Sequence, residues 1–190
     1  MRCRLVACGI GVAAAGLATH GVARADGALV TFSAPHAARA SAATLAPALE
    51  RALEQAPAPK DAKSALDAAL AFTASRLHFG LAHATSLAFD AQEREGNCVE
   101  YAHLFALAFD RLASRAHLTA RAWVVHSADA RLAGVVLPGR GMGEHDWALV
   151  VEPTPTGEVR RFVDPTFHDM GLPWDIAASV HGAVTLPPRR

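Results

Sequence analysis

The stretch EREGNCVEYAHLFALAF, residues 93–109, decides the expected fold of this chain. A glycine–asparagine pair opens its helical part. Asn97 can cap a helix in which Glu100, three residues later, completes a capping box. Over residues 101–112 apolar side chains then recur at helical spacing, which predicts one buried face. The pattern therefore sets Cys98 in the first turn of the clearest helix in the sequence.

Helical patterns come before this stretch and strand patterns come after it. Helices are predicted at residues 43–56 and at about 61–77, ahead of the Cys98 helix. Strands are predicted at residues 120–126, 145–152 and 158–163, with a turn at 153–157 between the last two. Helices followed by antiparallel strands indicate an α+β domain, with the helices on one face of a small antiparallel sheet.

The start of the chain has the three parts of an export signal. Arg2 and Arg4 give it positive charge, an apolar stretch over residues 5–18 follows, and Ala23-Arg24-Ala25 fits the pattern that signal peptidase cleaves. The apolar stretch is short for a membrane span, which needs about 20 residues. We therefore predict a signal peptide at residues 1–25, the alternative being a buried helix or an anchor.

Cleavage after Ala25 leaves enough chain for a single domain with a sizeable core. The Ala-rich residues 26–42 are predicted to form a loose N-terminal arm and residues 43–190 the domain. The protein is then expected in the periplasm or outside the cell, with no membrane span after cleavage. The leader also carries three arginines and no acid, so the remainder is slightly acidic and offers no electrostatic case for binding nucleic acid.

Cleavage removes Cys3 and Cys8 as well, and Cys98 is then the one cysteine of the exported chain. An odd cysteine in an exported protein is a candidate reactive thiol, although a free cysteine is often only a small buried residue. The thiolate is the reactive form, and the first turn of a helix favours an anion. A histidine that takes the thiol proton, and a carboxylate that orients the histidine, would complete a nucleophilic site.

His145, in EHDWALVVE, and Asp164, in RRFVDPTF, can supply these two groups. Pairing of the predicted strands around the 153–157 turn sets His145 opposite about position 165, within one residue of Asp164. Their adjacency thus follows from hairpin geometry, whereas contact with Cys98 depends on tertiary packing. Each residue alone has a plainer interpretation, as a bonded strand histidine, a turn aspartate or a core cysteine. Their joint occurrence favours a Cys-His-Asp triad.

These segments resemble the transglutaminase-like superfamily of cysteine enzymes, whose core belongs to the papain-like fold class. The likeness rests on GNCVEYAHLFALAF, ARAWVV, HDWALVVE and FVDPT, and it covers about residues 95–166. It implies that Cys98 is the nucleophile, His145 the general base and acid, and Asp164 the group that orients His145. There are two departures. All three tryptophans follow Cys98, whereas the animal enzymes have one ahead of the cysteine, and no acidic run has calcium-loop spacing.

Gln92 and Trp147 are further candidates for the same site. Gln92 lies six residues before Cys98, the spacing at which papain-like proteases have their oxyanion glutamine, and it would act beside the backbone N–H of Cys98. A solvated loop residue is the alternative. Trp147 shares the strand face of His145, so it is a possible wall of the site, with core packing as the alternative.

The resemblance implies an enzyme that acts on amide bonds, and exported relatives favour hydrolysis of a peptide or isopeptide bond in a peptide or protein substrate. Two alternatives stay open. One is transfer of the acyl group to an amine by the same triad, and the other is a non-catalytic binding module with the same fold. No metal or cofactor is expected, because His126, His168 and Asp169 lack the spacing of a metal-binding motif.

Overall fold

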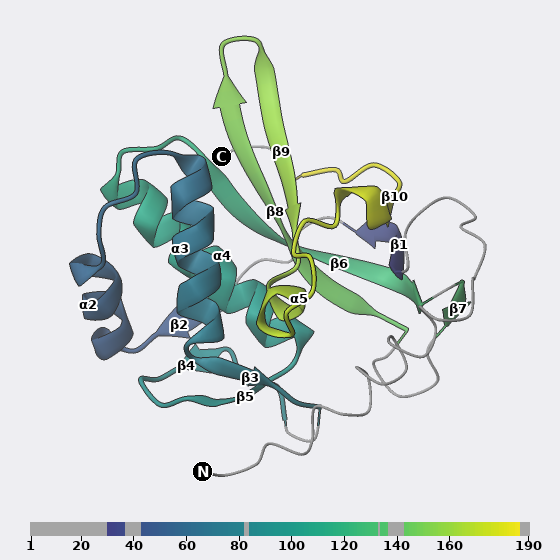
Figure 1. The fold of residues 1–190 in the computed structure, drawn as a ribbon, viewed down its shortest axis with the longest axis horizontal. Coiled ribbons are helices and arrows are strands. Elements are labelled where there is room, and N and C mark those ends of the chain that lie inside the picture. Colours follow the sequence, from purple (N-terminus) through teal and green to yellow (C-terminus); the bar gives the residue numbers. More distant parts are fainter. Residues whose placement is uncertain (1–29, 37–42, 82–83, 133, 137–142, 187–190) are drawn as a thin grey trace.

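The computed structural model describes residues 30–36, 43–81, 84–132, 134–136 and 143–186, and Figure 1 shows their arrangement. The elements in chain order are β1 (Val30–His36), β2 (Thr44–Leu45), α2 (Pro47–Gln55), α3 (Ala62–Ala74), β3 (Leu77–Phe79), β4 (Ala88–Phe89), β5 (Arg94–Gly96), α4 (Cys98–Arg115), β6 (Arg121–Leu132), β7 (Val135–Val136), β8 (His145–Thr154), β9 (Gly157–Val163), α5 (Pro165–Asp169), the 3₁₀ helix η1 (Ala177–Ser179) and β10 (Val180–His181). The predicted signal peptide at residues 1–25 lies outside the described residues.

The main sheet has the strand order β10-β1-β6-β8-β9, and β7 pairs with the end of β6. Neighbouring strands are antiparallel except for β10, which runs parallel to β1. In Figure 1, β8 and β9 continue beyond the rest of the sheet as a projecting hairpin. The predicted α+β class is confirmed, since an antiparallel sheet is combined with helices that come mostly before its central strands.

Two buried clusters hold the sheet from opposite faces. On one face, apolar side chains of α3 and α4 pack with Ala148 of β8 and Val163 of β9. On the other face, Phe32 of β1 and Trp147 of β8 pack with residues near the C-terminal end, among them Ile176. Successive strand residues point to opposite faces of a sheet, so Ala148 belongs to the first cluster and its neighbour Trp147 to the second. The strands that carry the candidate site are therefore fixed on both sides.

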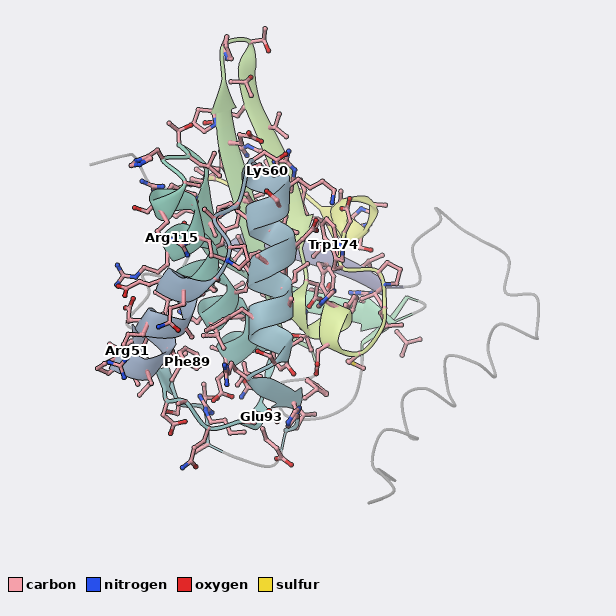
Figure 2. The ribbon with its side chains drawn as sticks, turned by 60° about the vertical axis from the view of Figure 1, so that its left-hand side comes forward. Arg51, Lys60, Phe89, Glu93, Arg115 and Trp174 are labelled. Carbon is pink, nitrogen blue, oxygen red and sulfur yellow. The ribbon has the colours of Figure 1, made fainter. Side chains whose placement is uncertain are left out.

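The helical layer is tied together at the far end of α4. Figure 2 shows α3 between Arg115 on one side and Trp174 on the other. The Nη2 of Arg115 donates to the carbonyl oxygen of Ala56 at 2.6 Å, just after α2 ends. Trp174, from the chain after α5, packs against the cluster that contains α3 and α4. These contacts hold α4 in one position relative to the sheet.

The start of α4 has the predicted capping box. The side chain of Asn97 accepts hydrogen bonds from the N–H groups of Val99, at 3.1 Å, and Glu100, at 3.3 Å. The carboxylate of Glu100 in turn accepts from the Asn97 N–H at 2.9 Å. Both ends of the box satisfy donors that a helix cannot satisfy internally, and this fixes where α4 begins. Cys98 is consequently the first residue of the helix.

The two earlier helices are present but are shorter than predicted. α2 begins at Pro47, which stands in its first turn as expected, because the preceding residues pair with β4 in a short parallel ladder. α3 ends at Ala74, and Leu77 instead starts β3, whose partner is β5. In both places a local helical pattern yields to backbone pairing with a segment that is distant in sequence.

The β8–β9 hairpin differs from the prediction by one residue in register. Ala148 faces Val163 and Thr154 faces Gly157, so the turn is tighter than the predicted one over residues 153–157. Gly157 has a φ of 140°, a backbone conformation that side-chain-bearing residues rarely adopt, and it closes this turn. β6 is also longer than predicted, because its second half pairs with β1.

The prediction of a loose arm over residues 26–42 is wrong for residues 30–36. These residues form β1, a strand with neighbours on both sides, β6 and β10. The alanines of this stretch obscure the alternation that buries Phe32, and the pairing partners lie about 100 or more residues away. The other residues of the predicted arm, 26–29 and 37–42, lie outside the described ranges. α5 was not predicted either, since it is only five residues long.

Candidate functional site

Cys98, the first residue of α4, has a free thiol that is neither fully buried nor fully exposed. Its position places the sulfur beside the first turn of an 18-residue helix. The unpaired N–H groups and the dipole of such a turn stabilise negative charge placed beside them. The sulfur is therefore in a position where reaction with a molecule from solvent is possible.

His145 and Asp164 form a short hydrogen bond, as the hairpin geometry predicts. His145 is the first residue of β8, and its Nε2 lies 2.7 Å from Oδ2 of Asp164. The Asp164 side chain is fully buried, and 14% of the His145 side chain is exposed. A buried carboxylate that accepts a ring N–H holds an imidazole in one orientation and tautomer.

The second oxygen of Asp164 is engaged in capping α5. Its Oδ1 accepts hydrogen bonds from the N–H groups of Thr166, at 3.0 Å, and Phe167, at 3.1 Å. Pro165 stands at the first position of α5, where its missing N–H costs nothing. The segment FVDPT thus fixes the carboxylate of Asp164 in one position. One oxygen accepts hydrogen bonds from the first turn of α5, and the other contacts His145.

The environment of His145 favours its protonated form. Burial alone would lower the pKa of His145, but the charge and hydrogen bond of Asp164 oppose it, followed by the hydrogen bond and charge of the Cys98 sulfur. Together these groups raise the pKa of His145 well above its ordinary value. Because Nε2 is bound to Asp164, Nδ1 is the ring nitrogen available to the thiol. Sulfur, imidazole and carboxylate therefore interact in that order.

Two phenylalanines enclose the His145 ring. The ring of Phe32 stacks on it with centroids 4.9 Å apart and planes 14° from parallel. The ring of Phe167 lies 5.9 Å away at a tilt of 33°. Phe32 comes from β1 and Phe167 from α5, so elements from both ends of the described chain meet at this histidine.

A side-chain hydrogen bond joins α4, which begins at Cys98, to α5, which Asp164 caps. The hydroxyl of Tyr101, one turn into α4, donates to Oδ2 of Asp169 in α5 at 2.6 Å. Burial raises the pKa of Tyr101, and the hydrogen bond with Asp169 and the charge of Asp169 raise it further. The phenol therefore stays protonated and acts as a donor. The contact fixes the distance between the helix that begins at Cys98 and the helix that Asp164 caps.

A second network holds the chain in front of α4. Glu100 is fully buried and pairs with the guanidinium of Arg94, and its Oε1 also accepts the Ser86 N–H at 3.0 Å. Arg94 donates to the Ser86 carbonyl at 2.7 Å, and the amide of Asn97 donates to Thr85 at 2.7 Å. The segment at residues 85–86 is thereby strapped to the start of the Cys98 helix. The cap interpretation of Glu100 is thus correct but incomplete.

A further histidine–carboxylate pair joins β6 to β8 directly after His145 in the sequence of β8. His126 of β6 faces Asp146 of β8, and Nδ1 of His126 lies 2.6 Å from Oδ1 of Asp146. The other ring nitrogen of His126 is 3.7 Å from a carboxylate oxygen of Glu144. His126 was considered as a metal ligand from the sequence, and the structure instead brings it against two carboxylates. Asp169, another such candidate, accepts from Tyr101.

Gln92 and Trp147 have different surroundings from those expected of a site residue. Gln92 is exposed in a turn, its N–H donates to Asp90 at 2.9 Å, and the extended β5 separates it from Cys98. Its role as an oxyanion donor stays a prediction that this position does not favour. Trp147 is fully buried, and its Nε1 donates to Ser127 at 2.9 Å. The structure favours the core-packing alternative for Trp147.

Several residues of this site were missed in the sequence. Phe32 carried no signal, because its contact with His145 spans more than 100 residues of chain. Phe167 follows the FVDPT segment directly, and Tyr101 lies on the predicted buried helix face, so a search for aromatic residues beside the triad could have found both. Arg94 was present in the quoted stretch, but nothing in the local pattern links it to Glu100.

No group of three or more His, Cys, Asp and Glu side chains arranged to hold a metal ion occurs among the described residues. In that same part of the chain no helix is long and apolar enough to cross a bilayer. Comparison with known proteins found no matching family model, no matching curated protein and no matching solved structure.

Proposed function

We propose that this protein is an exported cysteine-nucleophile enzyme that acts on amide bonds through Cys98, His145 and Asp164, most simply by hydrolysing peptide or isopeptide bonds. We further propose that its α+β fold is a transglutaminase-like core. The observation that carries the proposal is the position of His145 between two partners. Its Nε2 is held by Asp164 at 2.7 Å, and the Cys98 sulfur contributes to the raised pKa of its ring.

The raised pKa of His145 supports a resting thiolate–imidazolium pair. The proton leaves the Cys98 sulfur for His145 Nδ1, and Asp164 stabilises the resulting cation. The thiolate then attacks the carbonyl carbon of an amide, and the carbonyl oxygen becomes an oxyanion. In the first turn of α4 the N–H groups have no intrahelical acceptor, and the Asn97 side chain accepts those of Val99 and Glu100. The remaining Cys98 N–H is suited to the oxyanion.

His145 also serves the second half of the reaction. Collapse of the tetrahedral intermediate breaks the C–N bond while the imidazolium gives its proton to the departing amine, leaving a thioester on Cys98. Neutral His145 then removes a proton from water, whose oxygen attacks the thioester carbon. The C–S bond breaks, which releases a carboxylic acid and returns Cys98 as a thiolate beside protonated His145. No step of this cycle requires a metal or a cofactor. The substrate is a peptide or protein, and the site is proposed to work in the periplasm or outside the cell.

The test is acyl-enzyme trapping with a set of peptide amides and activated esters. The mature chain is expected to gain one acyl group on Cys98 by mass spectrometry and to release the acid on standing, while Cys98→Ala gains none. Addition of a fluorescent primary amine separates hydrolysis from transfer. Release of acid with little labelled amide supports hydrolysis, whereas mainly labelled amide replaces it with acyl transfer by the same triad. An unreactive Cys98 in every arm contradicts an enzyme and favours a binding module.

A further inference from the structure

We propose that Phe32, on the N-terminal strand β1, is a positioning residue for His145 that holds its ring in the productive orientation and favours its protonated form. This inference rests on the proposed function and adds to it a residue far from the three triad segments in sequence. The direct observation is the near-parallel stack of the two rings, with centroids 4.9 Å apart and planes 14° from parallel.

The stack and the bond to Asp164 favour the same orientation of the imidazole. A quarter turn of the imidazole about the bond that joins it to Cβ would break the 2.7 Å contact of Nε2 with Asp164 and would exchange the stacked contact with Phe32 for an edge-to-face one. Phe167 limits the ring from a second direction, at 5.9 Å, and lies 6.1 Å from Phe32. Because Asp164 and the two phenyl rings favour one orientation, Nε2 stays on Asp164 and Nδ1 stays on the side available to Cys98.

The stack also favours charge on the imidazole. The face of a phenyl ring is electronegative, so a cation over it is attracted, and more strongly where water is excluded. Phe32 is 1% exposed and His145 is mostly buried, so little water separates the two rings. An imidazolium is the form that His145 takes when it holds the proton of Cys98, and Phe32 stabilises that form on the face that Asp164 leaves open.

The backbone fixes Phe32 more firmly than a terminal segment would be fixed alone. Phe32 pairs with Ala130 of β6 on one side and with Val180 of β10 on the other. In Figure 1, β1 lies between β6 and β10, on the side of the sheet away from α2 and α3. Because β1 is paired on both sides, the Phe32 ring keeps a fixed position beside His145, which the side chain of an unpaired terminal segment would not.

Several titratable groups surround His145, so its response to pH does not depend on Phe32 alone. Asp164 and Cys98 contact it from α5 and α4. On β6 and β8 the neighbours are His126, Asp146 and Glu144, and α5 also carries His168 and Asp169. All of these remain in a Phe32 variant, so a change in the titration of His145 there reflects the ring.

The experiment uses the mature chain with Phe32→Met, which keeps apolar volume and removes the flat ring, and Phe32→Tyr, which keeps the ring. Phe105→Met is the matched control, because Phe105 is equally buried but lies in the cluster between the helices and the sheet. Imidazole resonances are followed by NMR against pH and assigned with His145→Gln. The rate at which iodoacetamide alkylates Cys98 is measured at pH about 6, because an ordinary thiol is mostly protonated at that pH. Thermal unfolding checks that each variant is folded.

Phe32→Met is expected to lower the protonation constant of His145 and the alkylation rate each by about three- to thirtyfold, the range that runs from exposed to desolvated cation–π contacts. Phe32→Tyr and Phe105→Met are expected to stay within about twofold of the wild type, less than that range. Unchanged values in a folded Phe32→Met overturn the proposal. So does an equal loss in Phe32→Tyr or in Phe105→Met, because the effect would then be one of stability.

If Phe32→Met does not fold, the wild-type spectrum decides. A phenyl ring stacked at this distance shifts the ring protons of His145 upfield, so normal imidazole shifts overturn the proposal and upfield shifts support it. Failure of the proposed function has a different signature. In that case His145→Gln alkylates Cys98 as fast as the wild type does, whereas failure of the Phe32 proposal alone leaves the difference between wild type and His145→Gln intact.

Discussion

The described part of the molecule has two neighbouring histidine–carboxylate pairs, one between β8 and the cap of α5 and the other between β6 and β8, and only the first also interacts with a thiol. The bonds are of similar length, 2.7 Å for His145–Asp164 and 2.6 Å for His126–Asp146. In the first pair Nε2 is bound and the thiol of Cys98 interacts with the same ring. In the second pair Nδ1 is bound and the other nitrogen points to the carboxylate of Glu144.

The comparison shows that a bonded histidine is not by itself a site. The Asp164 carboxylate comes from a helix cap that follows β9, so the imidazole it orients faces the start of α4. Asp146 comes from the strand directly opposite His126 and satisfies a cross-strand pair. What separates the pair proposed to be catalytic from the other pair is the third partner, the thiol of Cys98 in one case and the carboxylate of Glu144 in the other.

The largest expected effect is on the two histidines. His145→Gln and His126→Asn each keep an amide nitrogen near the ring nitrogen that holds the carboxylate, but neither side chain can take up a proton. His145→Gln is expected to lower amide hydrolysis by about 10³-fold, the scale of a lost general base. His126→Asn is expected to stay within about threefold of the wild type, well below that scale. Steady-state kinetics on a peptide amide measure both, and equal losses would remove the distinction between the pairs.

The two aspartates give the next largest effect. Asp164→Asn keeps a side chain able to cap α5 but removes the charge that favours imidazolium, and it is expected to lower kcat by about 10²-fold or more. Asp146→Asn removes a charge from the other pair and is expected to leave kcat nearly unchanged. The measurement is kcat for each variant under saturating substrate. A loss in Asp146→Asn as large as in Asp164→Asn would make both pairs part of the machinery.

Stability should depend on pH through His145. Its pKa is raised in the folded protein, so its contribution is fully present below the unfolded value of about 6.5 and is lost as pH rises through the folded value. The difference in Tm between the wild type and His145→Gln is therefore expected to be largest near pH 6 and to shrink toward alkaline pH. A few degrees are expected, since about 1 kcal/mol is about 2–4 °C at this chain length. A difference that grows with pH contradicts the assignment.

The smallest expected effect belongs to the side-chain hydrogen bond between α4 and α5. Tyr101→Phe leaves Asp169 without its donor and is expected to cost about 1–2 kcal/mol in the free energy of unfolding. It should also slow hydrolysis by about twofold, because the helix that Asp164 caps is held less firmly. Thr73→Val is the matched control, since it removes another buried hydrogen bond within α3. Thr73→Val should lower the free energy of unfolding without slowing hydrolysis. An equal loss of rate in the two variants would show that the Tyr101–Asp169 hydrogen bond has no specific role in the site.

The sequence predicts the parts of this site that are built from local rules. The capping box at Asn97 and Glu100 depends on residues three apart, and the hairpin between β8 and β9 depends on alternation and a turn. Both are present, the hairpin with a one-residue shift in register. Because the shift is small, the expected contact between His145 and Asp164 survives it.

The parts that the sequence did not predict depend on pairing between distant segments. β1 forms because β6 is long enough to take it as a partner, which a stretch rich in alanine does not reveal. The stack of Phe32 on His145 and the pair of Arg94 with Glu100 are side-chain contacts set by tertiary packing. The predicted oxyanion role of Gln92 rests on sequence spacing alone, and the structure has Gln92 exposed before β5.

The most direct test of the account is the rate at which iodoacetamide alkylates Cys98 in the mature chain, measured across pH in the wild type and in His145→Gln. A sulfur that has given its proton to His145 is expected to react rapidly at pH about 6, where an ordinary thiol is almost all protonated, and His145→Gln should lose that reactivity. Slow reaction at that pH in the wild type, or equal rates in the two proteins, would contradict it.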